Sequence, residues 1–382
     1  MTAPVVIVGA GLAGYNLARE WRKLDAETPL VIVARDAADF YSKPMLSNAL
    51  AGKKTPATLV MKPAAKMAEE LKATIRANTE VAAIDTVART VTLVDGEVLA
   101  YRDLVLALGA DPVRLPLLGD GADDVLSVND LGDYARFSER LESARQVAIL
   151  GAGLIGCEFA NDLLAREIKP TVIDPAAAPL SRLLPPQAGA LLAERLTDAG
   201  VGFRCGDSAQ RVERVGAGYE VVLESGARVP ADLVLSAVGL RPRTTLAEAA
   251  GLAVARGVVV AASLQTSVPH VYAVGDCAEV AGLNLPFVMP IMQQARALAA
   301  TLAGTATPVR YPAMPVLVKT PSCPTVVAPP VAGEGEWQCE DVEGGLIARC
   351  ISAEGGLVGF ALLGAATKER QALVAQLPAW LA

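Results

Sequence analysis

Two glycine-rich segments have the residue types and spacing that could hold phosphate groups. In a GxGxxG segment, the first glycine permits a tight turn, the second lets a pyrophosphate approach the backbone, and the third lets a helix pack on a strand. Free N–H groups at the start of that helix can then bind the phosphates. The residues concerned are Gly9, Gly11, Leu12, Ala13 and Gly14 in the first copy, and Gly151, Gly153, Ile155 and Gly156 in the second. The repeat predicts two dinucleotide sites, with glycines that merely tighten a turn as the alternative.

The segments around each glycine motif predict the elements that position it. Each motif follows an apolar strand, opens a helix and is followed by a second strand, which is the pattern of a βαβ unit in a parallel sheet. The expected strands and helices are 5–8, 15–24 and 30–34 in the first unit, and 146–150, 157–167 and 170–174 in the second. Because this context accompanies both motifs, the chain is expected to contain two doubly wound α/β domains.

Further periodic segments extend each unit and add a third one. Turn signals at Asp95-Gly96 and Ser225-Gly226 predict hairpins over 91–100 and 220–230, and each hairpin precedes an apolar strand. The other expected elements are a helix over 187–199, strands over 104–108, 201–205, 233–238, 316–319, 325–328, 346–351 and 357–362, an irregular connection over 321–335, and a helix near 368–377. The fold class is therefore α/β, with two Rossmann-like domains and a C-terminal α+β domain.

Composition excludes several kinds of function. The 382 residues are 52 % apolar, and 34 basic against 41 acidic residues give a net charge of −7, which argues against a nucleic-acid or anionic-membrane partner. The start of the chain lacks a basic segment and the apolar runs are short, so we expect a cytoplasmic protein without a membrane span. The only histidine, His270, is expected to be a loop residue, and no two of the six cysteines are closer than 11 residues, so no metal site is predicted.

A third motif carries a resemblance to a known family. Thr266, Ala273, Gly275 and Asp276 match the pattern TxxxxxxAxGD. With both glycine motifs, the sequence resembles the flavoprotein reductases related to glutathione reductase. This resemblance implies FAD on the first glycine motif and Asp276, and NAD on the second. It also implies a discontinuous FAD domain over 1–109 and 241–312, an inserted NAD domain over 110–240, and a C-terminal domain over 313–382.

The segment 40–48 distinguishes the branches of that family. Disulfide reductases have a CxxxxC pair there, whereas this segment has no cysteine. Tyr41–Ser47 instead resembles the (Y)x(R/K)PxLS segment of ferredoxin and rubredoxin reductases, and the likeness continues over 151–162, 236–243 and 316–321. Asn48 stands where ferredoxin reductases usually have lysine, which favours the rubredoxin branch.

The resemblance implies an activity and a partner. A hydride would pass from NADH to FAD, and single electrons would then pass to rubredoxin, for example in alkane hydroxylation. A flavorubredoxin reductase, the ferredoxin reductase of an oxygenase system, and a binding protein that senses NADH without turnover remain alternatives. An acidic rubredoxin would need a local basic patch. The candidate residues are Lys43, Lys53, Lys54, Lys62 and Lys66.

The resemblance also assigns roles to individual residues. Lys43 would lie near flavin N5 with Glu158 as its partner, and Lys319 would face the pyrimidine edge of the flavin. A loop lysine, a first-turn acid and an exposed strand lysine are the alternatives for these three residues. The remaining FAD positions are Ala34, Arg35, Pro44, Val81 and Val288.

The nicotinamide site is implied at the second glycine motif together with Gly239. Asp174, at the end of the strand 170–174, stands where an acid binds the ribose of NADH and disfavours the 2′-phosphate of NADPH. The equivalent position of the first unit is Ala34, so the usual acid for the FAD ribose is missing. Arg35 would instead pack on the adenine, and Val81 would hold it through its backbone unless it is a plain strand residue.

Overall fold

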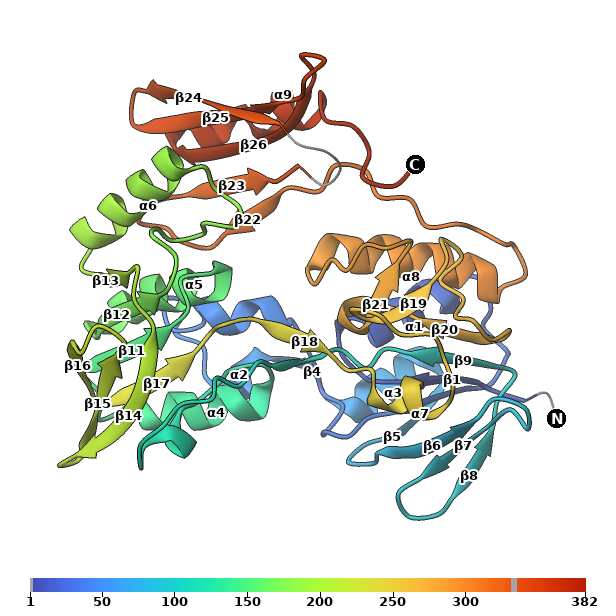
Figure 1. Cartoon of the computed structure of the whole chain (residues 1–382). Coiled ribbons are helices and arrows are strands. Elements are labelled where there is room, and N and C mark those ends of the chain that lie inside the picture. The colour runs from blue at the N-terminus through green and yellow to red at the C-terminus, as the bar shows by residue number, and fades with distance from the viewer. Residues whose placement is uncertain (1–2, 331–334) are drawn as a thin grey trace.

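The first of two parallel sheets contains the first glycine turn. A computed structural model describes residues 3–330 and 335–382 (Figure 1). The sheet has the order β20-β9-β1-β2-β5. Strands β20, β9, β1 and β2 are largely buried because their mainly apolar residues are covered on both faces, whereas the edge strand β5 alternates half-buried and exposed residues. The strands are β1 (Val5–Val8), β2 (Leu30–Val33), β5 (Ala73–Arg76), β9 (Asp103–Leu106) and β20 (Val271–Ala273), and the helices are α1 (Leu12–Arg22), α3 (Ala64–Leu71) and α8 (Val288–Leu302).

The second parallel sheet repeats this arrangement around the second glycine turn. Its order is β13-β12-β11-β17, with helices on its faces (Figure 1). The strands are β11 (Gln146–Leu150), β12 (Lys169–Asp174), β13 (Gly202–Cys205) and β17 (Leu233–Ser236), and the helices are α4 (Leu131–Arg140), α5 (Leu154–Leu163) and α6 (Pro186–Asp198). The predicted pair of doubly wound units is confirmed.

Small antiparallel sheets accompany both units. Each unit carries the expected hairpin as part of a three-stranded sheet, and the ribbon β10-β18 lies where the two units meet (Figure 1). The strands are β6 (Val81–Asp85), β7 (Thr90–Leu93) and β8 (Val98–Ala100); β14 (Ala209–Val215), β15 (Gly218–Leu223) and β16 (Arg228–Ala231); and β10 (Ala110–Pro112) and β18 (Leu240–Pro242). Two further pairs are β3 (Phe40–Tyr41) with β4 (Val60–Lys62), and β19 (Val258–Val260) with β21 (Ala278–Val280); the short helices α2 (Pro56–Leu59) and α7 (Thr245–Ala249) complete these parts.

The C-terminal part is an antiparallel sheet of order β22-β23-β26-β25-β24. It packs on α6, and its apolar side chains share one core with the second parallel sheet. The strand β24 was missed by the sequence analysis, and part of the predicted irregular connection, residues 331–334, lies outside the described residues. The elements are β22 (Val316–Val318), β23 (Thr325–Ala328), β24 (Glu336–Val342), β25 (Gly345–Ile351), β26 (Leu357–Gly364) and α9 (Arg370–Val374).

Candidate functional site

The first glycine turn has the shape of a phosphate cradle. Gly9 has φ +118°, and a Cβ there would lie 2.1 Å from the carbonyl oxygen of Ala107. A Cβ on Gly14 would lie 2.0 Å from the oxygen of Gly9, so helix and turn are in direct contact. At Gly11, where α1 begins, a Cβ would meet no atom of the described residues within 4 Å. The turn therefore leaves room for a ligand at the helix N-terminus, as the pyrophosphate of FAD requires.

The second glycine turn has the same geometry. Gly151 has φ +104°, a Cβ on Gly156 would lie 1.9 Å from the oxygen of Gly151, and the space at Gly153 is open to at least 4 Å among the residues described. Asp174 ends β12 beside this turn. Its carboxylate accepts hydrogen bonds from the N–H of Ala152 at 2.6 Å and of Ala176 at 2.8 Å, so it is fixed at the edge of the cradle.

The third motif returns to the first turn, as expected. A Cβ on Gly275, which has φ +78°, would lie 2.7 Å from the Cβ of Ala13, so this loop packs directly on α1. The N–H of Gly275 donates to the buried side chain of Gln294 on α8 at 2.6 Å. These contacts place Asp276 beside the first cradle, and Val288 starts α8 nearby in the chain.

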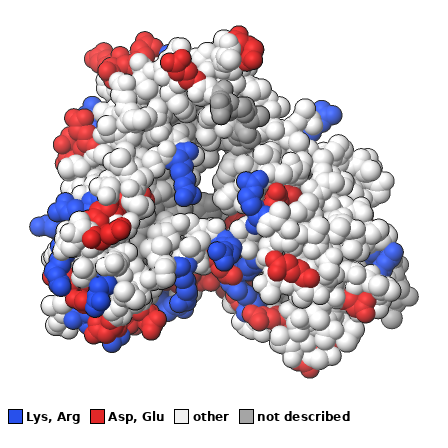
Figure 2. Space-filling view, in the orientation of Figure 1, with Lys and Arg blue, Asp and Glu red and all other residues white. Residues whose placement is uncertain are grey.

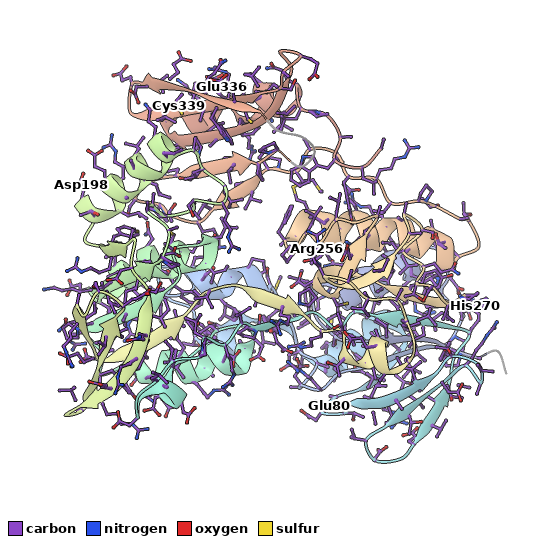
Figure 3. The ribbon with its side chains drawn as sticks, viewed as in Figure 1. Glu80, Asp198, Arg256, His270, Glu336 and Cys339 are labelled. Carbon is purple, nitrogen blue, oxygen red and sulfur yellow. The ribbon has the colours of Figure 1, made fainter. Side chains whose placement is uncertain are left out.

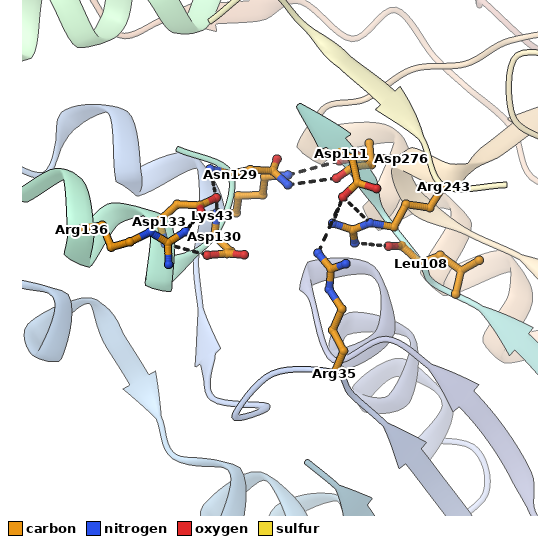
Figure 4. A network of polar contacts seen from close by, with 11 residues as sticks. Arg35, Lys43, Leu108, Asp111, Asn129, Asp130, Asp133, Arg136, Arg243 and Asp276 are labelled. Atoms are coloured by element: carbon orange, nitrogen blue, oxygen red, sulfur yellow. Dashed lines mark hydrogen bonds and ion pairs between the residues drawn. The ribbon is translucent and has the colours of Figure 1, made fainter. Parts of the chain in front are cut away.

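Lys43 and Asp276 form one side of a polar network between the two units (Figure 4). The Nζ of Lys43 lies 3.8 Å from Oδ2 of Asp276. Burial lowers the pKa of Lys43, and the carboxylate of Asp276 partly opposes this shift. In the same network, Asp111 on β10 accepts from Nε of Arg243 at 2.7 Å and lies 3.7 Å from Arg35. The site thus gathers cations next to the first cradle.

The expected partnership between Lys43 and Glu158 was wrong. Glu158, on α5, instead forms an ion pair with Nζ of Lys319 and accepts from the backbone N–H of Lys319 at 3.0 Å. It also accepts from the hydroxyl of Ser47 at 2.6 Å. The reason is the 3₁₀ helix η1 (Lys43–Asn48): its second turn, with Ser47, faces α5, whereas Lys43 at its start reaches Asp276.

Three residues that the sequence analysis missed belong to the same region. Ser47, Asn161 and Asp162 are buried polar side chains, and each contacts a segment distant in sequence. A usable signal was present, because Glu158, Asn161 and Asp162 lie on one face of an otherwise apolar helix. Their partners could not be inferred from that spacing.

The other residues predicted to contact FAD or NAD lie in different parts of the two units. Ala34 is buried behind β2, and Arg35 is exposed beside Asp111. The other positions lie at element ends or in loops: Pro44 within η1, Val81 at the start of β6, Ile155 exposed on α5, and Gly239, with φ +114°, between β17 and β18. Their contacts with FAD and NAD stay predictions.

The structure places two cysteines, Cys157 and Cys277, near the cradles and buries both. Burial raises the pKa of the Cys157 thiol to about 12 and that of Cys277 to about 11. Since the thiolate is the nucleophile, we expect iodoacetamide at pH 8 to leave both residues unmodified in the native protein, with NADH-dependent activity unchanged. Mass spectrometry of the alkylated protein checks this. Loss of activity together with labelling of Cys157 or Cys277 would contradict it.

Three other expectations concern features outside the cradles. His270 lies in the loop before β20, at the outer edge of the first unit (Figure 3), where its Nδ1 is 3.0 Å from Asp103. In residues 3–330 and 335–382, no helix is both long and apolar enough to cross a membrane. Within the same residues, no three His, Cys, Asp or Glu side chains are grouped as metal ligands would be.

Two glycine cradles on parallel sheets, with an Asp motif returning to the first, define the class of flavoproteins that use a pyridine nucleotide. A family model described as pyridine nucleotide-disulphide oxidoreductase matches residues 3–301, and the chain belongs to this family, whose members bind FAD and NAD. A second model, described as the rubredoxin binding C-terminal domain, matches residues 308–377.

Individual proteins give the same result. The chain is 48 % identical to the rubredoxin-NAD(+) reductase of Alcanivorax borkumensis, over 98 % of this chain and 99 % of that protein. It is 40 % identical to the nitric oxide reductase FlRd-NAD(+) reductase of Aeromonas salmonicida, over 98 % and 96 %. Among solved structures, a ferredoxin reductase from Rhodopseudomonas palustris superposes with a TM-score of 0.89 at 27 % identity, over 99 % and 96 %.

Proposed function

We propose that the protein is an NADH-dependent rubredoxin reductase. The observation that carries this proposal is the combination of two features. The first is the pair of glycine cradles, which leave space at Gly11 and Gly153 among the described residues, and the second is a C-terminal segment that matches the rubredoxin binding domain. A relative that bears this activity in its name is 48 % identical over 98 % of this chain and 99 % of that protein. FAD, when bound, accepts a hydride and gives up electrons one at a time.

The residues of the chain would divide the work as follows. The N-termini of α1 and α5 would bind the two pyrophosphates, and Asp276 would hold the ribityl end of FAD next to Lys43. Lys319, held by Glu158, would place a positive charge at the flavin, where negative charge develops on reduction. These side chains would bind and orient FAD and NADH. No acid–base residue of the chain is required for electron transfer, because FAD supplies that chemistry.

The molecular surface supports the docking of an acidic partner. The face in Figure 2 is hollowed between the two units, and several Lys and Arg side chains border the hollow, with some Asp and Glu side chains beside them, although the chain as a whole carries a net charge of −7. Opposite charges speed the encounter of electron-transfer proteins, and salt weakens it. Binding of rubredoxin is therefore expected to fall as ionic strength rises.

The test is a stopped-flow experiment in two steps. FAD-loaded protein is mixed with NADH under anaerobic conditions, and the reduced protein is then mixed with oxidised rubredoxin, ferredoxin or a disulfide. We expect NADH to bleach the flavin band and rubredoxin to restore it fastest. Restoration only by ferredoxin would move the protein to the neighbouring branch, and restoration by none of them would favour an NADH-sensing protein.

The choice of NADH gives a separate prediction for Asp174. Replacing it by asparagine keeps the shape but removes the negative charge that repels a 2′-phosphate. We expect the preference for NADH over NADPH, measured as the ratio of kcat/KM values, to fall about tenfold. An unchanged ratio would show that another group sets the choice. Flavin content serves as the control for folding.

A flavorubredoxin reductase is the second candidate, because the relative from Aeromonas salmonicida bears that activity in its name at 40 % identity. Comparing reoxidation rates with both acceptors separates the two. The proposal also includes the supply of electrons to alkane hydroxylation and a cytoplasmic location. It further includes four domain limits, which are 1–109, 110–240, 241–312 and 313–382. The return of β20 to the first sheet supports a discontinuous FAD domain.

A further inference from the structure

The inward face of α5 carries an unusual set of buried polar side chains. Glu158, Asn161 and Asp162 are 3 %, 8 % and 3 % exposed, although their neighbours Cys157 and Phe159 are apolar core residues. A buried polar group costs free energy unless it is hydrogen-bonded, and a buried charge costs more. Each of the three side chains must therefore have a hydrogen-bond or ion-pair partner that offsets the cost of its burial.

The partner of Asp162 is the backbone that follows η1. Oδ2 of Asp162 accepts from the N–H of Leu50 at 2.9 Å, and Oδ1 accepts from the N–H of Ala51 at 2.8 Å. Burial raises the pKa of Asp162, and these two amides oppose the rise. Asn161 makes a separate contact, accepting from the N–H of Ser322 at 3.1 Å.

The segment held by Asp162 is the one that begins with Lys43. A six-residue 3₁₀ helix has poor internal hydrogen-bond geometry and depends on outside contacts for a fixed position. Leu46 and Leu50 pack into the core of the second unit, and Asp162 clamps the two amides at the far end. Gly153, the N-cap residue of the same α5, forms part of the second cradle. One helix thus touches the nucleotide cradle and the lysine-bearing segment.

We propose that Asp162 is a positioning residue of the hydride-transfer site, which fixes the segment from Lys43 to Ala51 relative to the nicotinamide cradle by accepting the backbone amides of Leu50 and Ala51. The inference rests on the proposed function for the role of that site. It predicts that loss of the carboxylate changes the placement of Lys43 and leaves the binding of NADH phosphates intact. Asp162 acts through the backbone and touches no reacting group.

The first test measures amide hydrogen exchange in the FAD-loaded protein. In the wild type, the amides of Leu50 and Ala51 should exchange slowly. In Asp162→Asn, which keeps the volume but presents an NH₂ group to one amide, their exchange should rise about tenfold or more. The matched control is Asp198→Asn, an exposed position at the end of α6 (Figure 3), which should change nothing. Asn161→Ala should affect Ser322 only.

The second test separates positioning from mere stability. In Asp162→Asn, the limiting rate of flavin reduction by NADH should fall about tenfold while the apparent Kd for NADH stays within twofold. Fast exchange of Leu50 and Ala51 in the wild type, which needs no variant, would overturn the inference. Faster exchange in the variant with an unchanged reduction rate would also overturn it, because the clamp would then be only structural. Neither measurement uses rubredoxin. They therefore still test the role of Asp162 if rubredoxin proves not to be the electron acceptor.

Discussion

A Gly153→Val variant is expected to purify as a yellow, FAD-loaded protein that NADH no longer reduces. Gly153 has φ −74° and ψ −173°, which any residue adopts, and a Cβ there would meet no atom of the described residues within 4 Å. The chain should therefore fold normally. The valine side chain would, however, fill the space in which the phosphates of NADH meet the N-terminus of α5.

The size of this effect follows from the hydrogen bonds that the phosphates would lose. Two bonds from N–H groups to a charged acceptor are worth at least about 3 kcal/mol, which corresponds to a loss of more than about 100-fold in NADH affinity. Anaerobic titration with NADH measures it, and dithionite should still reduce the flavin.

The matched variant is Gly11→Val in the first cradle, where the backbone is equally extended and the space equally open among the described residues. This variant should purify without FAD. The two results would assign the cradles to different dinucleotides. Bleaching of Gly153→Val by NADH with an unchanged Kd would refute the assignment.

The second large effect is expected on stability, for Glu158→Ala. This carboxylate is almost fully buried, and it holds Ser47 and both the amide and the ammonium group of Lys319. Removing one partner of a buried ion pair costs about 3–5 kcal/mol, since the other charge is left unpaired. Lys319 is 29 % exposed, so we expect the lower end, about 3 kcal/mol of unfolding free energy.

A double-mutant cycle tests whether the pair is the cause. Lys319→Met removes the charge but keeps most of the apolar stem, and the double variant should be more stable than the sum of the single losses implies, by at least about 1 kcal/mol. Urea unfolding of the FAD-loaded proteins, followed by circular dichroism, gives these values. Strictly additive losses would mean that Glu158 stabilises the fold through Ser47 and the amide alone.

Local sequence patterns predicted the two cradles because the constraints there are local. Gly14 and Gly156 are needed because each meets the backbone of the glycine five residues earlier, and Gly9 and Gly151 are needed because the turn gives them positive φ angles. The additional close approaches of Gly9 to Ala107 and of Gly151 to Ala237 are long-range contacts that the local pattern does not contain. The hairpins were equally accessible, since Asp95-Gly96 and Ser225-Gly226 specify their own turns. The strand β24 was missed because it follows the Pro- and Gly-rich connection closely and has an exposed, polar face.

Long-range polar pairing could not be predicted in the same way. The spacing on α5 indicates a polar face, but it does not say that Asp162 meets Leu50 or that Glu158 meets Lys319, because these partners are more than 100 residues away. The expected Lys43–Glu158 pair failed for this reason. Which lysine reaches a given carboxylate depends on the direction in which η1 leaves the sheet, and this direction is set by tertiary packing.

The position of β20 in the first sheet has a consequence for biosynthesis. This strand pairs with β9 and completes the first sheet, but its residues, Val271–Ala273, are synthesised late. The last strand of the second sheet ends earlier in the chain, at Ser236. On the ribosome, the second unit therefore has all its strands before the first unit does. We therefore expect the second unit to fold before the first, although the first sheet's N-terminal strands are synthesised earlier. Until β20 leaves the ribosome, the edge of β9 with which it pairs stays exposed.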